Sequence, residues 1–213
     1  MAFRSKLESV TIVSAAPFES EPTLKLLTVA GVTNTYSCVG VGALQSAKNA
    51  GKTASVCCDQ NVVFIGTAGI FGPFNDIEIV RAQFVEWLPP CVRHGIAYSI
   101  PKDNGPYDLP KSLQEFQHLR AAHVICSPTI TTLPSFAPKA ANPGTVWVEN
   151  LELFSCFREI IAVAKSFTVL LGITNSVGPM GHTEWQANHH DAAVKTANLF
   201  LHLASISAQT NPL

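Results

Sequence analysis

Short apolar runs and longer amphipathic stretches alternate along most of the chain. The apolar runs include "SVTIVSA", "NVVFIGTAG", "AAHVICSPTIT" and "FTVLLGITN", and the stretches that follow such runs include "EPTLKLLTVA", "ALQSAKNAGK" and "LELFSCFREIIAVAK". Continuous apolar strands that alternate with helices are typical of a sheet covered by helices on both faces. The pattern therefore predicts a three-layer α/β fold, with a mostly parallel or mixed central sheet flanked by helices.

The last amphipathic stretch predicts a long helix with one buried face. Its apolar positions recur at spacings of three and four, which place side chains on one side of a helix. These positions are Ala193, Ala197, Phe200, Leu201 and Ala204. Between about residues 72 and 119 the chain is richer in Pro, Gly and Asp, which predicts surface loops around the apolar run "DIEIVRAQFVEW". We find no repeat or linker, and 213 residues suit one domain over residues 1–213.

The composition narrows the classes of partner. Hydrophobic residues make up 47% of the chain and charged residues 14%, with a net charge of -1. Binding to a nucleic acid or an anionic membrane needs clustered Lys and Arg, so neither partner is expected. The low charge content favours extensive burial between layers or in a subunit interface. No apolar segment reaches the roughly 18 residues of a membrane span, and the run "MAFRSKLESVTIVSA" lacks a signal-peptide core, so we expect a cytoplasmic protein.

Acidic residues follow two of the predicted strands. Glu19 and Glu21 come after "VTIVSA", and Glu149 and Glu152 stand where "TVWVE" passes into a predicted helix. Ligands of open α/β sheets bind beyond the carboxyl ends of strands, where such side chains would lie. The alternative for each carboxylate is an ordinary favourable charge at a helix N-terminus. These residues alone leave both interpretations open.

Two glycine-containing turns also follow predicted strands. In "CVGVGALQSA" the third glycine of a dinucleotide-binding motif would fall at Gln45, so Gly40 and Gly42 indicate a tight strand-to-helix turn rather than a cofactor site. In "FIGTAGIFG" the backbone around Gly69 can approach a ligand closely, and Thr67 offers a hydroxyl group. The alternative for the second turn is a glycine-rich strand crossover.

A cluster of titratable residues lies in and after the loop "GPMGHTEWQANHH". The cluster consists of His182, Glu184, His189, His190 and Asp191. It begins in a loop and lacks the HExxH spacing of zinc hydrolases, so a solvated helix face is the favoured interpretation and no metal is expected.

Five segments in order resemble the motifs of the nucleoside phosphorylase and nucleosidase superfamily, over nearly the whole chain. They are "VTIVSAAPFESEPTLKLL", "VGVGALQSAKNA", "FIGTAGIFG", "VENLELF" and "GITNSVG". The resemblance implies a mixed central sheet that holds a nucleoside. It implies that Glu21 orients the attacking water, with Glu19 as the other possible register. Thr67 matches the small hydroxyl residue beside the nucleophile, and Gly69 is expected in the same substrate site.

The resemblance also assigns residues to the sugar and to the purine of the nucleoside. Leu151 and Glu152 match a Met-Glu pair that packs on the sugar and binds its hydroxyl groups, with Asn150 beside them. Asn175 matches the residue that faces the imidazole-ring nitrogen of the purine, which is usually aspartate in methylthioadenosine nucleosidases. We expect Glu21 and Asn175 to be catalytic and the others to bind the substrate.

Two departures from the family pattern refine the expected activity. Phosphorylases of this kind carry an arginine for phosphate where this chain has Phe64, so water is the expected nucleophile. Asn175, in "ITNSVG", is more similar to futalosine hydrolases of menaquinone biosynthesis than to methylthioadenosine nucleosidases. An amide cannot serve as a general acid, so proton transfer from this residue is not expected.

The expected function is therefore purine nucleoside N-ribohydrolase, acting on futalosine or 6-amino-6-deoxyfutalosine. The alternatives are a 5'-methylthioadenosine/S-adenosylhomocysteine nucleosidase and a nucleoside-binding protein without catalysis. No cofactor is expected, and the resemblance implies a homodimer.

Overall fold

The computed structural model describes residues 10–29, 34–93, 95–96, 98, 104–109, 112–133 and 146–209. The strands are β1 (Val10–Ser14), β2 (Thr35–Cys38), β3 (Asn61–Ile70), β4 (Ile79–Trp87), β5 (Tyr107–Asp108), β6 (Ala121–Cys126), β7 (Val146–Glu149) and β8 (Ser166–Ser176). The helices are α2 (Pro17–Val29), α3 (Ala43–Cys57), α4 (Pro90–Arg93), the 3₁₀ turn η1 (Gln114–Phe116), α5 (Leu153–Val163) and α6 (Gly181–Gln209). The predicted alternation of strands and helices is present from β1 to α3 and again from β7 to α6.

The strands form one mixed sheet that closes on itself. β3 pairs in parallel with β1 and β8, and β1 pairs in parallel with β2. β8 pairs antiparallel with β4, β4 pairs in parallel with β6, and β6 pairs in parallel with β7. β7 then returns to β3 as an antiparallel neighbour. Five strands therefore form a closed ring in the order β3, β8, β4, β6, β7, and β1 with β2 extends it on one side.

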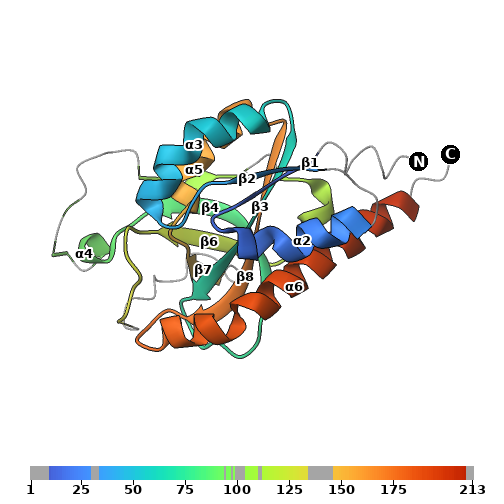
Figure 1. The fold of residues 1–213 in the computed structure, drawn as a ribbon. Coiled ribbons are helices and arrows are strands. Elements are labelled where there is room, and N and C mark those ends of the chain that lie inside the picture. Colours follow the sequence, from blue (N-terminus) through green and yellow to red (C-terminus); the bar gives the residue numbers. More distant parts are fainter. Residues whose placement is uncertain are drawn as a thin grey trace.

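Helices cover the sheet on two sides. α3 packs against α5 above the sheet in the view of Figure 1, and α2 packs against α6 below it. The apolar side chains between these layers are buried from solvent, and the largest fully buried ones include Phe64, Phe167, Phe200 and Leu171. The arrangement confirms the predicted α/β fold with a mixed central sheet flanked by helices.

The buried face of α6 agrees with the predicted stripe as far as it is described. Ala193, Ala197 and Phe200 are at most 3% exposed, while the side chains of Leu201 and Ala204 lie outside the described part of the chain. Among the described residues, no helix is both long and apolar enough to cross a membrane.

Two predicted boundaries were wrong. The run "CSPTIT" was predicted to continue a strand, but β6 ends at Cys126 and the chain from 127 to 133 forms no strand. The stretch 72–119, predicted as loops around one strand, also contains the short elements α4, β5 and η1. Both differences arise because polar residues and prolines obscure the period of the hydrophobic pattern over short segments.

Candidate active site

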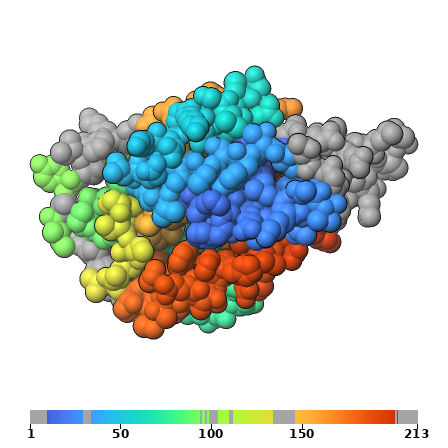
Figure 2. Space-filling view, viewed as in Figure 1, coloured from blue at the N-terminus to red at the C-terminus, as the bar shows by residue number. Residues whose placement is uncertain are grey.

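A pocket opens where four strand-to-helix junctions meet. It has a volume of about 260 Å³. Its walls come from the β1–α2, β7–α5 and β8–α6 junctions and the end of β3, with Val41 from the β2–α3 junction and Ile130 from the segment after β6. In Figure 2 the surface is hollowed between α2, the start of α6 and that segment. The pocket therefore lies at the position that the sequence predicts for a ligand, beyond the carboxyl ends of parallel strands.

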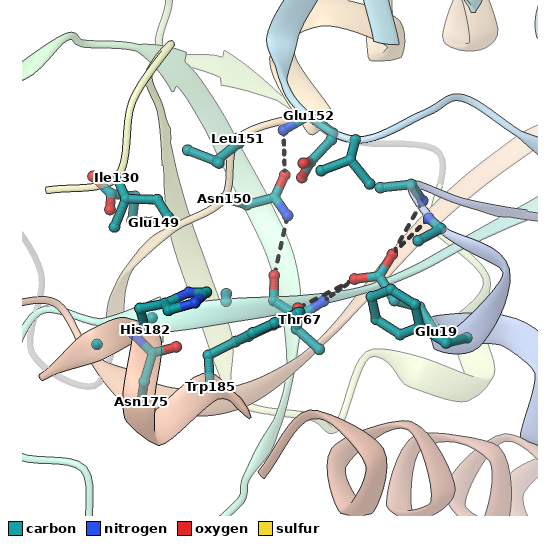
Figure 3. Close-up of a pocket in the computed structure, with 17 residues that line it drawn as sticks. Glu19, Thr67, Ile130, Glu149, Asn150, Leu151, Glu152, Asn175, His182 and Trp185 are labelled. Atoms are coloured by element: carbon teal, nitrogen blue, oxygen red, sulfur yellow. Dashed lines mark hydrogen bonds between the residues drawn. The ribbon is translucent and has the colours of Figure 1, made fainter. Parts of the chain in front are cut away.

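Glu19 is the buried carboxylate of this pocket. Its side chain is in the first turn of α2 and the residue is only 5% exposed. Oε2 accepts hydrogen bonds from the backbone N–H groups of Ala15 and Ala16, both at 3.1 Å. Oε1 accepts two more from Thr67, one from its backbone N–H and one from its hydroxyl, again at 3.1 Å (Figure 3). Four donors thus fix the carboxyl group in one orientation.

The environment of Glu19 shifts its acidity toward neutral pH. Burial is the main cause and the nearby charge of Glu152 adds to it, and together they raise the pKa of Glu19 from 4.5 to about 7. The hydrogen bonds from Ala16 and Thr67 oppose this shift because they stabilise the ionised form. A carboxyl group with a pKa near neutral pH is suited to exchanging a proton with water.

Glu21 does not line the pocket, contrary to the position expected from the sequence for the first carboxylate. Its side chain is 57% exposed and forms an ion pair with Lys25 at 2.7 Å, one turn further along α2. That neighbour is also the main cause that lowers the pKa of Glu21. The structure places the alternative residue, Glu19, where Glu21 was expected.

Asn150 organises the β7–α5 junction. Its Oδ1 accepts hydrogen bonds from the backbone N–H groups of Glu152 at 3.0 Å and Leu153 at 2.9 Å, which are at the start of α5. Its Nδ2 donates to the backbone carbonyl of Thr67 at 3.1 Å (Figure 3). Asn150 lines the pocket, but these contacts give it the role of joining α5 to β3.

Glu152 and Leu151 complete this wall. Glu152 is 7% exposed, and its Oε1 accepts a hydrogen bond from the backbone N–H of Gly42 at 2.8 Å. Burial raises the pKa of Glu152, and the Gly42 hydrogen bond opposes the rise. Gly42 has a φ of 82°, a conformation that L side chains rarely adopt, so this glycine turn serves to deliver a backbone donor to Glu152.

Asn175 lies on the opposite wall, where β8 bulges against β3. Its Oδ1 accepts a hydrogen bond from the hydroxyl of Thr174 at 2.7 Å, and its Nδ2 donates to the carbonyl of Ser176 at 2.9 Å. Gly69 is its partner across the bulge, and a Cβ atom at Gly69 would lie 2.7 Å from Nδ2 of Asn175. Both line the pocket, and the lack of a side chain at Gly69 makes room for the amide.

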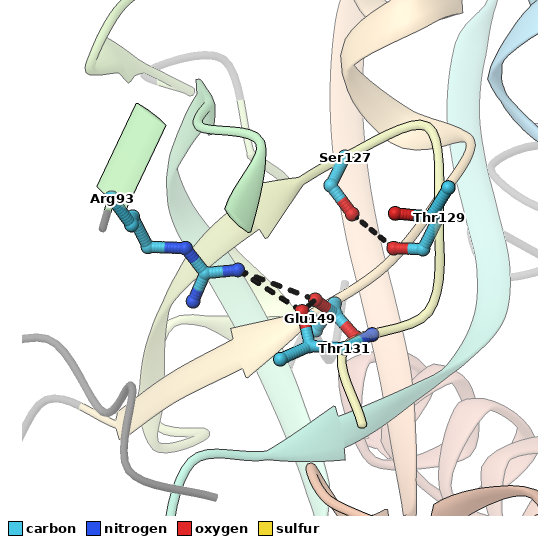
Figure 4. A network of polar contacts seen from close by, with 5 residues as sticks. All are labelled: Arg93, Ser127, Thr129, Thr131 and Glu149. Carbon is cyan, nitrogen blue, oxygen red and sulfur yellow. Dashed lines mark hydrogen bonds and ion pairs between the residues drawn. The ribbon is translucent and has the colours of Figure 1, made fainter. Parts of the chain in front are cut away.

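The segment after β6 is attached to the pocket rim by a buried ion pair (Figure 4). Glu149, 7% exposed, accepts hydrogen bonds from the backbone N–H of Thr131 at 3.0 Å and from the Thr131 hydroxyl. Arg93 on α4 approaches Glu149 at 3.5 Å and donates to the Thr131 hydroxyl at 3.2 Å. Glu149 therefore holds the chain next to Ile130, and its negative charge is paired rather than directed at a ligand.

Two aromatic residues of α6 line the pocket but were not identified as site residues from the sequence. His182 and Trp185 line the pocket from the first turns of α6, in a stretch interpreted as a solvated helix face. Their aromatic rings stack with an interplanar angle of 17°. The signal was available in "GHTEW", because an aromatic residue one turn after a strand-to-helix loop faces the same edge of the sheet as the loop.

The charges around the pocket do not favour a phosphate ion. None of the described residues that line it is a Lys or an Arg. Phe64, at the position where phosphorylases were expected to carry arginine, is fully buried in the core. Within the described part of the chain, no group of three or more His, Cys, Asp or Glu residues is arranged to hold a metal ion.

Comparisons with known proteins identify the fold. No protein-family model matches the chain, and no curated protein sequence is significantly similar to it. Solved structures do match. A putative 5'-methylthioadenosine/S-adenosylhomocysteine nucleosidase from Francisella philomiragia has a TM-score of 0.72 at 13% identity, over 92% of this chain and 98% of that one.

Two Helicobacter pylori proteins match over similar lengths. A mutant MTAN with 5'-methylthioadenosine in its active site has a TM-score of 0.69 at 14% identity, over 92% of this chain and 98% of the other. Native futalosine hydrolase has a TM-score of 0.67 at 14% identity, over 93% and 98%. The chain therefore has the nucleosidase-like fold that its sequence motifs predicted.

Proposed function

We propose that this protein hydrolyses the N-glycosidic bond of a purine nucleoside. The observation that carries the proposal is the meeting of Glu19, Glu152 and Asn175 in one pocket, each from a different strand-to-helix junction. The fold that the chain shares with nucleosidases supports the same activity.

Glu19 is the proposed base. Its pKa of about 7 leaves a useful fraction ionised at neutral pH, and its carboxylate can take a proton from a water molecule in the pocket. The water oxygen then bonds to the anomeric carbon of the ribose as the bond from that carbon to the purine nitrogen breaks. The electron pair of that bond leaves with the purine, and solvent supplies the proton that the released purine finally carries.

Glu152 is the proposed sugar-binding carboxylate. One hydrogen bond from Gly42 orients it, and a carboxylate has about four acceptor positions, so capacity remains for two ribose hydroxyl groups. Its charge also lies near the sugar, which gains positive character as the purine leaves. Glu19 and Glu152 together stabilise that developing charge.

Asn175 supports a 6-oxopurine substrate. As the purine leaves, electron density accumulates on its ring nitrogens, and an amide N–H directed at the imidazole-ring nitrogen stabilises that state. An amide also tolerates a 6-oxo group, whereas an ionised aspartate would face that oxygen with like charge. Among purine nucleosides we therefore favour futalosine, with 6-amino-6-deoxyfutalosine second and 5'-methylthioadenosine or S-adenosylhomocysteine as alternatives.

The test is base release from a panel of purine nucleosides, with and without inorganic phosphate, followed by chromatography. We expect free base and the free sugar, with its 5' substituent retained, at a rate that does not depend on phosphate, because no cation among the described lining residues would hold phosphate. A rate that saturates in phosphate, with ribose 1-phosphate as product, contradicts the hydrolase assignment.

The same panel separates the alternatives. Higher efficiency on methylthioadenosine than on futalosine identifies a methylthioadenosine-type enzyme. Tight binding of nucleosides by calorimetry without any base release identifies a binding protein. Glu152→Gln tests the sugar-binding role, because it keeps the size of the side chain and weakens a charge-assisted hydrogen bond to the sugar by about 1.5–3 kcal/mol.

A further inference from the structure

Trp185 contacts the catalytic centre through one hydrogen bond. Its indole Nε1–H donates to the hydroxyl oxygen of Thr67 at 3.2 Å, across 118 residues of sequence. The same hydroxyl donates to Oε1 of Glu19 at 3.1 Å. A chain of two hydrogen bonds thus leads from α6 through β3 to the buried carboxylate, and Figure 3 shows the three side chains beside one another.

The indole fixes the direction of this chain. An indole N–H can only donate, so the Thr67 oxygen must accept from Trp185. A hydroxyl has a single proton, and here that proton points to Glu19. A donor directed at a carboxyl oxygen stabilises the ionised form over the protonated form. Of the four donors on Glu19, the Thr67 hydroxyl is the only side-chain group, and therefore the only one whose direction a neighbour can set.

The packing of the indole ring leaves it little freedom. The ring of His189 stacks on it with centroids 4.6 Å apart and an interplanar angle of 19°. His182 stacks at 5.8 Å, and Phe18 meets the ring edge-on at 6.0 Å. The N–H group is therefore held toward Thr67, because the ring cannot rotate without losing these contacts.

We propose that Trp185 is a positioning residue that keeps Glu19 ready to accept a proton by orienting the Thr67 hydroxyl. The inference rests on the proposed hydrolase function, in which Glu19 is the base. It adds a role for Trp185 besides that of a pocket wall, and it predicts a specific dependence of that role on Thr67.

Other titratable groups lie on the elements packed around Glu19 and Trp185 and must stay constant in the test. They are Glu152 at the start of α5, Tyr36 and Cys38 on β2, and His182, Glu184 and His189 on α6. The substitutions below leave all of them in place.

The kinetic test is a double-mutant cycle with Trp185→Phe and Thr67→Val. Phenylalanine keeps an aromatic wall but removes the N–H, and valine keeps the shape of threonine but removes the hydroxyl. We expect Trp185→Phe to move the acidic limb of the kcat/KM profile to higher pH by about 0.5–1 unit, which lowers kcat/KM at pH 6 by about three- to tenfold. The deficit shrinks as pH rises, because Glu19 is then ionised in both proteins.

The cycle distinguishes positioning from direct contact with substrate. In the Thr67→Val background, Trp185→Phe should have no further effect on the acidic limb, because the hydroxyl through which it acts is gone. In the Thr67→Ser background, which keeps a hydroxyl, the full effect should return. An equal loss in all three backgrounds, or a loss confined to KM without any change in the pH profile, overturns the proposal.

A measurement without substrate separates this proposal from the proposed function. Carbon-13 NMR of glutamate carboxyl groups, assigned with Glu19→Gln, gives the titration midpoint of Glu19 in the ligand-free protein. We expect Trp185→Phe and Thr67→Val each to raise this midpoint, and the double variant to match Thr67→Val alone. An unchanged midpoint in Trp185→Phe overturns the positioning role even if the enzyme hydrolyses nucleosides, and absent base release by the wild type overturns only the function.

Discussion

At the scale of single residues, the burial of Glu19 has a measurable effect on stability. Its pKa rises from 4.5 in an exposed chain to about 7 in the folded protein. The folded state therefore binds more protons than the unfolded state between these values, and stability falls as pH rises through this window. Relative to pH 4.5, the ionised Glu19 destabilises the fold at pH 8 by up to about 3 kcal/mol.

We predict that Glu19→Gln flattens this part of the pH dependence. The variant loses stability through poorer hydrogen bonding, because an amide NH₂ must face either the backbone N–H groups of Ala15 and Ala16 or the backbone N–H and hydroxyl of Thr67. Its free energy of unfolding should nevertheless change less between pH 4.5 and 8 than that of the wild type. Urea unfolding at a series of pH values measures both slopes, and parallel curves would mean that Glu19 ionises normally.

The two neighbouring carboxylates should differ sharply in activity. Glu19→Gln removes the proposed base and should lower kcat by roughly 10²–10⁴-fold, the usual contribution of a positioned acid or base. Glu21→Gln removes an exposed carboxylate paired with Lys25 and should leave kcat within about twofold of wild type. Steady-state kinetics on the preferred nucleoside measure both effects. A larger loss of kcat in Glu21→Gln than in Glu19→Gln would restore Glu21 as the proposed base.

Asn175 should determine which purine is preferred. We predict that Asn175→Asp shifts the ratio of kcat/KM values toward 6-amino nucleosides, because an ionised aspartate repels a 6-oxo group. The expected size is about 1–3 kcal/mol, the cost of one unsatisfied buried polar group. The measurement compares an inosine-type and an adenosine-type substrate with the same 5' group. A constant ratio would mean that Asn175 does not contact the base and only ties the loop to Thr174 and Ser176.

At the scale of elements, the start of α5 joins two parts of the site. Asn150 accepts from two N–H groups of this helix end and donates to β3. We predict that Asn150→Ala lowers the free energy of unfolding by about 1–2 kcal/mol, the usual cost of losing a helix cap, and reduces kcat because Glu152 loses its fixed position. Urea unfolding and steady-state kinetics measure the two effects.

A second variant separates the two contacts of Asn150. Asn150→Asp keeps acceptors for the helix N–H groups but turns an oxygen toward the Thr67 carbonyl. A larger loss for Asn150→Asp than for Asn150→Ala would show that the bond to β3 matters more than the cap.

The position of α2 explains the register error at the first carboxylate. The sequence "APFESEPTLKLL" has two prolines, and proline favours the first turn of a helix. The amphipathic stretch "EPTLKLLTVA" begins at Glu21, whereas the helix begins at Pro17 and carries Pro22 inside it. Residues two apart on a helix point to nearly opposite sides, so an error of two residues in the register exchanges the buried and the exposed glutamate.

Other features of the site were accessible from the sequence for clear reasons. Thr67 and Asn175 lie near the carboxyl ends of the apolar strands β3 and β8, and Glu152 follows β7, so their place at one edge of the sheet follows from the strand pattern. Trp185 and the Arg93–Glu149 pair were missed because each depends on contacts between distant elements. The local spacing of apolar and polar residues in a sequence does not predict contacts between distant elements.

At the scale of the whole molecule, the association state remains a prediction. Val41 and Ile130 line the pocket yet are 64% and 52% exposed, so apolar surface lies open at the pocket mouth. We expect a homodimer, with twice the chain mass of 22.8 kDa by light scattering, that covers this surface. Val41→Lys should weaken the dimer. Val29→Lys serves as the control, because Val29 is exposed at the end of α2, away from the pocket lining. A monomer at all concentrations would contradict the expectation.

The closed ring of strands limits how the pocket can move. β3 and β8 carry Thr67, Gly69 and Asn175, and each has paired neighbours on both sides, whereas β2 and β5 stand at the two ends of the pairing order. A strand inside a ring cannot peel away from one edge, so its amide protons exchange with solvent only when the ring itself comes apart. We therefore expect the amide protons of the pocket floor on β3 and β8 to exchange more slowly than those of the end strands β2 and β5. Substrate access must then depend on the surrounding segments and side chains, which can fluctuate while the floor stays intact.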